Sequence, residues 1–211
     1  MKVAISGATG LIGTALRESL AADGIEIVAL SRKPSVSPLE TIPWDVENGR
    51  FDASPLEQVD AVVHLAGEPI AQRWNDARKK AIRESRVNST KLLVEGLKSL
   101  ERRPKVLVSS SAIGFYGDRG DEALEESSPP GTGFLPETCQ AWEHAAMEAM
   151  GVGIRTAVLR TGIVLSTRGG ALKTMLLEGQ RVVPKKLLET GYRFRFPELQ
   201  GALSDVLARK R

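Results

Sequence analysis

The chain has 211 residues, of which 42% are hydrophobic and 26% charged, so a buried core is feasible and wholesale disorder is excluded. Its net charge of +3 arises in residues 178–211, where eight basic residues accompany four acidic ones, and we interpret this segment as a solvated surface rather than a nucleic-acid-binding one. One cysteine, Cys139, and two histidines, His64 and His144, exclude an internal disulfide and a metal centre built from several cysteines or histidines. Because no apolar run reaches the ~18 residues of a membrane span, we expect a cytoplasmic protein.

The predicted elements alternate between strands and helices along the chain. Runs of β-favouring or apolar residues predict six strands, at Val3–Ser6, Ile25–Leu30, Thr41–Trp44, Ala61–Leu65, Val106–Ser110 and Ile154–Leu159. Apolar residues at helical spacing predict four helices, at Leu11–Ala22, Asn75–Leu100, Pro136–Met150 and from Pro197 onward. Continuous apolar strands that alternate with helices indicate a parallel sheet covered on both faces. We therefore expect an α/β fold with a doubly wound parallel sheet.

A glycine-rich loop joins the first predicted strand to the first predicted helix. In such loops the first glycine permits a tight turn, the second lets the backbone approach a pyrophosphate, and the third lets the helix pack on the strand. The helix N-terminus then offers its unpaired N–H groups to the phosphates. A tight turn without a ligand is the alternative, but the strand–loop–helix context disfavours it. The loop predicts a dinucleotide site with these cofactor-binding residues: Gly7, Thr9, Gly10, Leu11, Ile12 and Gly13.

The end of the second predicted strand indicates which dinucleotide binds. An NAD-preferring site usually places Asp or Glu there to bind the ribose hydroxyls, whereas this sequence has Ser31-Arg32-Lys33. Arg32 offers a planar fork of donors for a 2′-phosphate, and Ser31 adds a hydroxyl. NADP(H) is therefore favoured over NAD, the alternative being that Arg32 is a solvated surface residue.

Further motifs carry a family resemblance. They follow the glycine loop in this order: Ser31-Arg32-Lys33-Pro34, Trp44-Asp45, His64-Leu65-Ala66-Gly67-Glu68, Arg73-Trp74-Asn75 and Ser109–Gly117. Together they resemble the extended and atypical short-chain dehydrogenase/reductases, and more narrowly the nucleoside-diphosphate-sugar epimerase-like proteins, some of which are labelled cell-division inhibitors. The resemblance implies a Rossmann-type fold.

The same resemblance implies further cofactor-binding residues. Leu65, Ala66 and Gly67 would pass beneath the cofactor, Arg86 would reach toward it, and Val164 would lie near the nicotinamide. Without the resemblance, Arg86 reads equally well as a charge on a helix surface, and Val164 reads as a core residue.

Part of the catalytic machinery usual for this superfamily is absent from the sequence. Hydride-transfer enzymes of this superfamily combine a Ser or Thr after the fifth strand with a Tyr-x-x-x-Lys pair on the next helix. Ser111 stands where that serine is expected, although a Ser-rich strand end is also an ordinary turn. Cys139 and Glu143 replace the Tyr-Lys pair, and we interpret Cys139 as a packed residue because a carboxylate neighbour raises a thiol pKa. Tyr116 is the remaining phenol near the expected site, either as a substrate contact or acid/base group, or as an aromatic cap over the pocket.

Two functions fit these observations. The first is an NADP(H)-binding epimerase or oxidoreductase acting on a small, nucleotide-sugar-like substrate, and the second is a non-catalytic NADP(H)-binding regulator. The resemblance covers residues 1–177 and resumes in residues 178–211, so we expect an NADP-binding domain, a C-terminal tail module, and the absence of most of the intervening substrate-binding segment. We expect a small-molecule substrate, no nucleic-acid or membrane partner and no metal, and we leave open whether the chain forms a homodimer.

Overall fold

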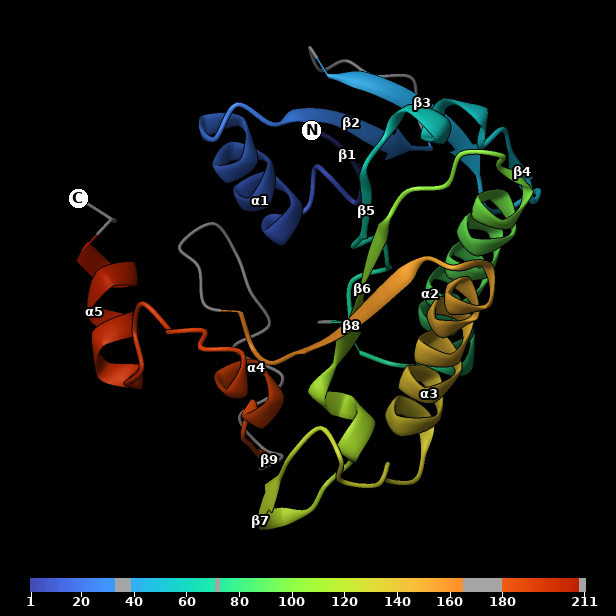
Figure 1. Cartoon of the computed structure of the whole chain (residues 1–211). Helices are drawn as coiled ribbons and strands as arrows, with labels where there is room; N and C mark the ends of the chain where they lie inside the picture. Colours follow the sequence, from blue (N-terminus) through green and yellow to red (C-terminus); the bar gives the residue numbers. More distant parts are fainter. Residues whose placement is uncertain (33–38, 71–72, 165–179, 209–211) are drawn as a thin grey trace.

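The computed structural model describes residues 1–32, 39–70, 73–164 and 180–208. Its centre is a seven-stranded sheet with the strand order β4-β3-β2-β1-β5-β6-β8 (Figure 1). Neighbouring strands are parallel except β3 and β4, which are antiparallel. The strands are β1 (Lys2–Ser6), β2 (Glu26–Ser31), β3 (Glu40–Asp45), β4 (Arg50–Phe51), β5 (Ala61–His64), β6 (Val106–Ala112) and β8 (Arg155–Thr161).

Helices cover both faces of this sheet. Helix α1 (Leu11–Ala22) lies on one face, and α2 (Asp76–Ser99) and α3 (Phe134–Met147) lie on the other (Figure 1). The prediction of an α/β fold with a doubly wound parallel sheet is therefore confirmed. Three short 3₁₀ helices join these elements, at Ser54–Gln58, Ile113–Tyr116 and Glu148–Val152. Because β1 has β2 on one side and β5 on the other, the chain changes direction there, and a crevice forms at the carboxyl ends of these strands.

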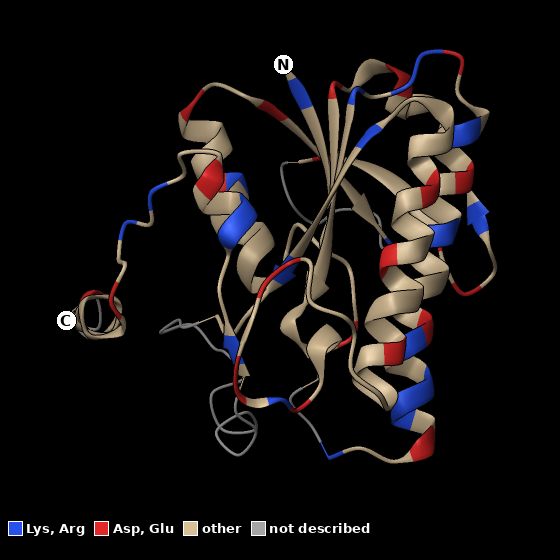
Figure 2. Cartoon of the chain, turned by 60° about the horizontal axis from the view of Figure 1, so that its bottom comes forward, with Lys and Arg blue, Asp and Glu red and all other residues tan. Residues whose placement is uncertain are grey.

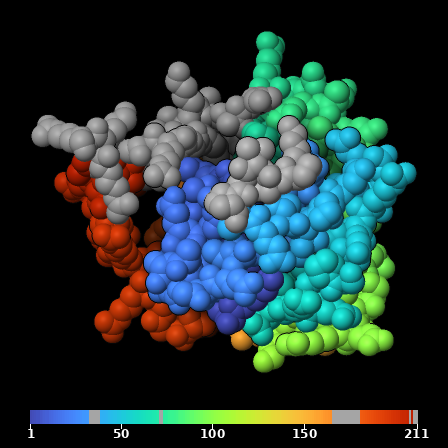
Figure 3. All heavy atoms as spheres, turned by 90° about the horizontal axis from the view of Figure 1, so that it is seen from above, coloured from blue at the N-terminus to red at the C-terminus, as the bar shows by residue number. Residues whose placement is uncertain are grey.

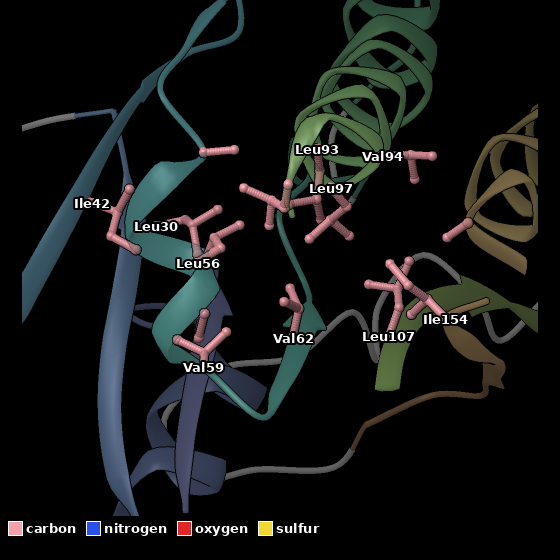
Figure 4. Close-up of a cluster of buried hydrophobic side chains, with 14 of the residues drawn as sticks. Leu30, Ile42, Leu56, Val59, Val62, Leu93, Val94, Leu97, Leu107 and Ile154 are labelled. Atoms are coloured by element: carbon pink, nitrogen blue, oxygen red, sulfur yellow. The ribbon is translucent and has the colours of Figure 1, made fainter. Parts of the chain in front are cut away.

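The main hydrophobic core lies between the sheet and α2. Leu93 and Leu97 of α2 are fully buried against strand residues such as Val62 and Leu107 (Figure 4). Burying a leucine side chain contributes roughly 2 kcal/mol to the free energy of unfolding, so this helix is held by its apolar face. Its first turn is capped by Asn75, whose side-chain oxygen accepts the Arg78 N–H at 2.8 Å. Charged residues of both signs are interspersed along the helices that flank the sheet (Figure 2).

A second, smaller sheet pairs a strand that precedes α3 with a strand from the C-terminal part of the chain. Strands β7 (Gly120–Leu124) and β9 (Gln180–Val182) pair in a parallel two-stranded sheet, and the short helices α4 (Lys185–Glu189) and α5 (Leu199–Ala208) come after it. Helix α5 lies on the side of α1, opposite α2 and α3 (Figure 1), and Figure 3 shows the C-terminal residues beside the N-terminal ones. The sequence predicted a helix after Pro197 but missed β4, β7, β9 and α4. Among the described residues, no helix combines the length and the apolarity needed to cross a membrane.

Candidate cofactor site

A cavity of about 1120 Å³ opens at the carboxyl ends of β1, β2 and β5. Its walls are the glycine-rich loop after β1, the end of β2, the loop after β5 and one face of α2. It is lined by these predicted cofactor residues: Gly7, Thr9, Gly10, Ser31, Arg32, Leu65, Ala66 and Gly67. A second cavity of about 440 Å³ lies beside α1 and β8, and Leu65 lines both. The structure thus brings most of the predicted cofactor residues to one crevice.

The glycines of the first loop are required by close backbone contacts. Gly7 has a φ of +69°, and a Cβ atom there would lie 2.9 Å from the carbonyl carbon and oxygen of Leu65. A Cβ on Gly13 would lie 2.9 Å from Cα of Ala8 and would collide with the Gly7 carbonyl oxygen. Gly10 is the N-cap of α1 and, as a glycine, has no side chain to bond the amides of the first turn. This cradle fits a diphosphate, because the backbone itself can approach the phosphate oxygens.

The floor of the cavity is fixed by a buried serine of β1. The Oγ atom of Ser6 accepts the backbone N–H groups of Leu65 at 3.1 Å and Ala66 at 3.2 Å. It also lies 2.6 Å from Nδ1 of the buried His64. Because both N–H groups are donors, the Ser6 hydroxyl hydrogen is left to point to Nδ1, which therefore acts as an acceptor.

The other ring nitrogen of His64 is fixed by α2. Nε2 lies 3.0 Å from Oγ1 of Thr90 and 3.2 Å from Oγ of Ser89. Both hydroxyls donate to backbone oxygens of α2, Thr90 to Arg86 at 2.7 Å and Ser89 to Ser85 at 2.6 Å, so Nε2 carries the hydrogen. Burial lowers the pKa of His64 to about 4. His64 is therefore a neutral structural link between β1, β5 and α2 beneath the cavity.

Arg86 lies below the loop after β5 rather than in the cavity lining. Its Nη2 donates to the Glu68 carbonyl at 3.0 Å and its Nη1 to the Ile82 carbonyl at 3.1 Å. A Cβ atom on Gly67 would lie 3.2 Å from the Arg86 guanidinium carbon, and the same group stacks 5.3 Å above the Trp142 ring centroid. Burial lowers the pKa of Arg86. The geometry makes Arg86 a support for the loop that carries Leu65–Glu68.

The second cavity is lined by two predicted residues of the glycine-rich loop and by Val164, which was predicted near the nicotinamide. Leu11, Ile12 and Val164 line it with Ala15, Leu159 and the polar residues Ser110 and Thr161. It is mostly apolar, and it opens between α1 and the carboxyl end of β8. Val164, which resemblance alone placed here, is half-buried in this wall.

Ser111 and Tyr116, the predicted catalytic residues, lie in a different cluster. The Ser111 hydroxyl is buried and donates to Oε1 of Glu143 at 2.6 Å. Arg160 donates to both oxygens of the same carboxylate at 2.8 Å, and it also donates to the Tyr116 hydroxyl at 3.0 Å. The Tyr116 hydroxyl in turn donates to the Glu125 carbonyl at 2.9 Å, and its side chain is 1% exposed. Neither residue lines either cavity, so their catalytic role stays a prediction.

Phe115 and Cys139, which border this cluster, are also buried. The Arg160 guanidinium lies 3.4 Å from the Phe115 ring centroid. Burial opposes its charge, but the hydrogen bonds to Glu143 and Tyr116 raise the pKa of Arg160. Cys139 is buried beside them, and burial with the Glu143 charge raises the pKa of its thiol to about 11. The thiol is therefore protonated near neutral pH, as expected for a packed residue.

Sequence reasoning missed two walls of the larger cavity. One is formed by β3 and its flanks, and its residues are Leu39, Thr41, Trp44, Val46 and Glu47. The other is on α2, and its residues are Ala81, Glu84, Ser85, Asn88 and Ser89. Their spacing of three and four residues, with small or polar side chains, is the pattern of one helix face. That pattern was a usable signal, because an amphipathic helix that packs on a sheet does not otherwise need a small and polar stripe beside its apolar one.

Comparison with known proteins extends this picture. The model of the NAD dependent epimerase/dehydratase family matches residues 3–178, and that of a domain of unknown function, DUF1731, matches residues 161–206. An epimerase family protein of Mycobacterium bovis is 42% identical over 175 residues, which cover 82% of this chain and 57% of that protein. The human epimerase family protein SDR39U1 is 37% identical over 181 residues, which cover 84% of this chain and 59% of that protein. The chain thus spans little more than half the length of these curated relatives.

Two solved structures are also similar. A nucleoside-diphosphate sugar epimerase from Corynebacterium glutamicum superimposes with a TM-score of 0.85 and 32% identity, covering 98% of this chain and 58% of that one. Isoform 2 of human SDR39U1, crystallised with NADPH, superimposes with a TM-score of 0.84 and 26% identity, covering 98% of this chain and 99% of that one. All residues that line the two cavities lie within residues 3–178, which the family model matches. The curated relatives that match this region carry the same family name. This chain belongs to the NAD-dependent epimerase/dehydratase family.

Proposed function

We propose that this chain binds NADP(H) in the crevice at the carboxyl ends of β1, β2 and β5, as an epimerase- or oxidoreductase-like protein for a small, nucleotide-sugar-like substrate. The carrying observation is the larger cavity, which is lined by both the glycine-rich loop and Arg32. The human relative crystallised with NADPH supports the choice of cofactor, because that chain and this one cover each other almost completely.

Different residues of this chain would hold different parts of the dinucleotide. The backbone of Gly7, Gly10 and the first turn of α1 would hold the diphosphate, and Arg32 would hold the 2′-phosphate. Leu65, shared by both cavities, would lie where the two halves of the dinucleotide meet. When bound, the nicotinamide supplies hydride transfer, and the apolar wall with Val164 would keep water from that end.

The division of the chain is part of the same proposal. We assign residues 1–177 to the cofactor-binding domain and residues 178–211 to a C-terminal tail module. Two observations support this: the separate family models that match residues 3–178 and 161–206, and the alignment of the bovine relative over 302 positions, which covers 99% of this chain and all of that protein. An alignment so much longer than 211 residues is what a missing internal segment of this chain would produce.

A second function is favoured by the closed cluster around Glu143. Where related enzymes combine a serine with a Tyr-Lys pair, Ser111 is bonded to Glu143, and Cys139 has a pKa raised to about 11. No proton donor or acceptor of that cluster faces either cavity. This arrangement supports a non-catalytic protein in which bound NADP(H) stabilises one conformation.

The test of cofactor binding is a pair of arginine variants. We expect Arg32→Ala to weaken NADPH binding about tenfold, as for the loss of charge-assisted hydrogen bonds, while NADH binding changes little. Arg83→Ala, which removes an exposed arginine of α2 that does not line the cavity, is the matched control. Isothermal titration calorimetry measures both affinities. Equal binding of NADPH and NADH by the wild type would contradict the assignment of Arg32, and no binding of either would contradict the proposed function.

A separate measurement distinguishes the two functions. Stereospecific loss of deuterium from labelled NADPH in the presence of a carbonyl substrate is expected of the enzyme and not of the regulator. Binding without any such transfer, across a panel of nucleotide sugars, would favour the non-catalytic function.

A further inference from the structure

The loop after β5 places one carboxylate between two guanidinium groups beside the larger cavity. Oε2 of Glu68 lies 3.3 Å from Nη1 of Arg78 on α2, and Oε1 lies 3.9 Å from Nη1 of Arg32 at the end of β2. Glu68 and Arg32 line the cavity, whereas Arg78 stands behind them. The three side chains form a charged row from α2 to the arginine proposed to bind the 2′-phosphate.

The inner part of this row is held firmly. The Glu68 N–H donates to Oγ of Ser85 at 3.1 Å, and the Glu68 carbonyl accepts from Nη2 of Arg86 at 3.0 Å. Arg78 is fixed by its Nη2, which donates to the Pro69 carbonyl at 2.6 Å. The backbone of Glu68 is therefore held by two side chains of α2, and Arg78 is bonded to the loop backbone one residue further on.

The outer part of the row is loose by comparison. The Arg32 side chain is 65% exposed, against 31% for Glu68 and 21% for Arg78. A long exposed side chain loses rotamer freedom when it binds a ligand, and a neighbour that restrains it in advance reduces that loss. Glu68 is placed to be this neighbour, since its own position is set by the loop.

We propose that Glu68 is a positioning residue for cofactor selection, which holds the Arg32 guanidinium beside the cavity so that its remaining N–H groups meet the 2′-phosphate of NADP(H). The inference rests on the proposed function. A guanidinium has five N–H donors in a planar fork, so contact with Glu68 through Nη1 leaves the Nε and Nη2 donors for a phosphate. Arg78 offsets the negative charge of Glu68, and the row as a whole stays positive toward an anion.

Two other roles for the Glu68 carboxylate would give different experimental results. In NAD-binding sites an acidic residue accepts hydrogen bonds from the ribose hydroxyls, which would make Glu68 a determinant of NADH binding. Alternatively, its charge would repel the 2′-phosphate, and its removal would strengthen NADPH binding.

The experiment compares the full chain with the variants Glu68→Gln, Arg32→Ala and the double variant. Glutamine keeps the side-chain length and the backbone hydrogen bonds of Glu68, removes its charge and replaces one acceptor oxygen by an NH2 donor. Isothermal titration calorimetry with NADPH, NADH and adenosine 2′,5′-bisphosphate measures the affinities. We expect Glu68→Gln to weaken NADPH and the bisphosphate about threefold, the size of one exposed ion pair, without changing NADH. In the Arg32→Ala background, Glu68→Gln is expected to have no further effect.

Glu84→Gln is the matched control, because Glu84 also lines the cavity but pairs with Lys80. An effect of Glu68→Gln no larger than that of Glu84→Gln would overturn the inference, as would tighter NADPH binding or a loss confined to NADH. If the wild type prefers NADPH and Glu68→Gln keeps that preference, only the positioning role fails. If the wild type binds neither cofactor, both the proposed function and this inference are contradicted.

Discussion

Two polar regions lie at the carboxyl edge of the same sheet, and they differ in where their hydrogen bonds go. At β1, β2 and β5, the glycine loop and the loop after β5 leave a cavity of about 1120 Å³ between them. At the ends of β6 and β8, Ser111, Glu143, Arg160 and Tyr116 form hydrogen bonds with one another, and none of them lines either cavity. Glycines and small residues make room in the first region, whereas long side chains close the second.

The difference shows what turns a polar strand end into a ligand site. In both regions the buried polar side chains named above, among them Ser6, His64 and Ser111, have hydrogen-bond partners. In the cofactor region the partners hold the backbone from below, as Ser6 and His64 do, and leave the upper side of the loop open. In the second region the side chains bond to one another and to the backbone carbonyls of Glu125 and Glu126, and none of the four lines either cavity.

Removing the Glu143 carboxylate is the strongest way to separate the two regions. We expect Glu143→Ala to lower the free energy of unfolding by about 4 kcal/mol, because a partly buried Arg160 then loses its partner. Urea unfolding at pH 7 measures the change. The folded variant is expected to keep its NADPH affinity, since Glu143 lines neither cavity.

Glu148→Ala is the control for this variant, because it breaks a more exposed ion pair with Lys98 near the same helix. It should lower the free energy of unfolding by less than about 1 kcal/mol. Lost NADPH affinity in Glu143→Ala, at an unchanged free energy of unfolding, would show that the two regions act as one site.

Acid is the next strongest probe, and it acts on the cofactor region through His64. Its pKa is about 4 in the folded chain and near 6.5 when unfolded, so between these values the unfolded chain binds more protons. Stability from neutral His64 is therefore complete above pH 6.5 and is lost as the pH falls toward 4, on the order of 3 kcal/mol in total. Urea unfolding at several pH values measures this loss.

The variant His64→Gln isolates this contribution from that of the carboxylates. We expect its free energy of unfolding to fall less steeply between pH 6.5 and 4 than that of the wild type. Identical slopes in the two proteins would mean that His64 is not held neutral beneath the cavity.

The parts of the fold that the sequence predicted well have local signals. The strand–loop–helix start of the chain is such a case: α1 begins and ends where the apolar spacing and Asp23-Gly24 indicate. Strands β7 and β9 had no such signal, because each is short and its partner lies more than 50 residues away. Their pairing depends on tertiary contacts, for example the Val183 N–H that donates to the Leu124 carbonyl at 2.8 Å.

The candidate site also contains residues that the sequence could predict and residues whose contacts it could not predict. Gly7, Gly13 and Arg32 could be predicted, because a glycine in a tight turn and an arginine at a strand end act through their own positions. The surroundings of Ser111 could not, because its partner Glu143 is 32 residues away and Arg160 joins from another strand. The position of a serine along a strand indicates that its hydroxyl is near the crevice. Only the folded structure shows whether that hydroxyl already has a hydrogen-bond partner within the protein.

The smallest expected effect comes from the Tyr116 hydroxyl, and it sharpens the comparison most directly. Tyr116→Phe removes the donor to Glu125 and an acceptor of Arg160, so we expect the free energy of unfolding to fall by about 1 kcal/mol. Tyr192→Phe, at a half-exposed ring, is the control and should change stability little. NADPH affinity, measured by calorimetry, should be the same in both variants. If Tyr116→Phe instead weakened NADPH binding at unchanged stability, the phenol would belong to the cofactor site, and the boundary between the two regions would have to move to include it.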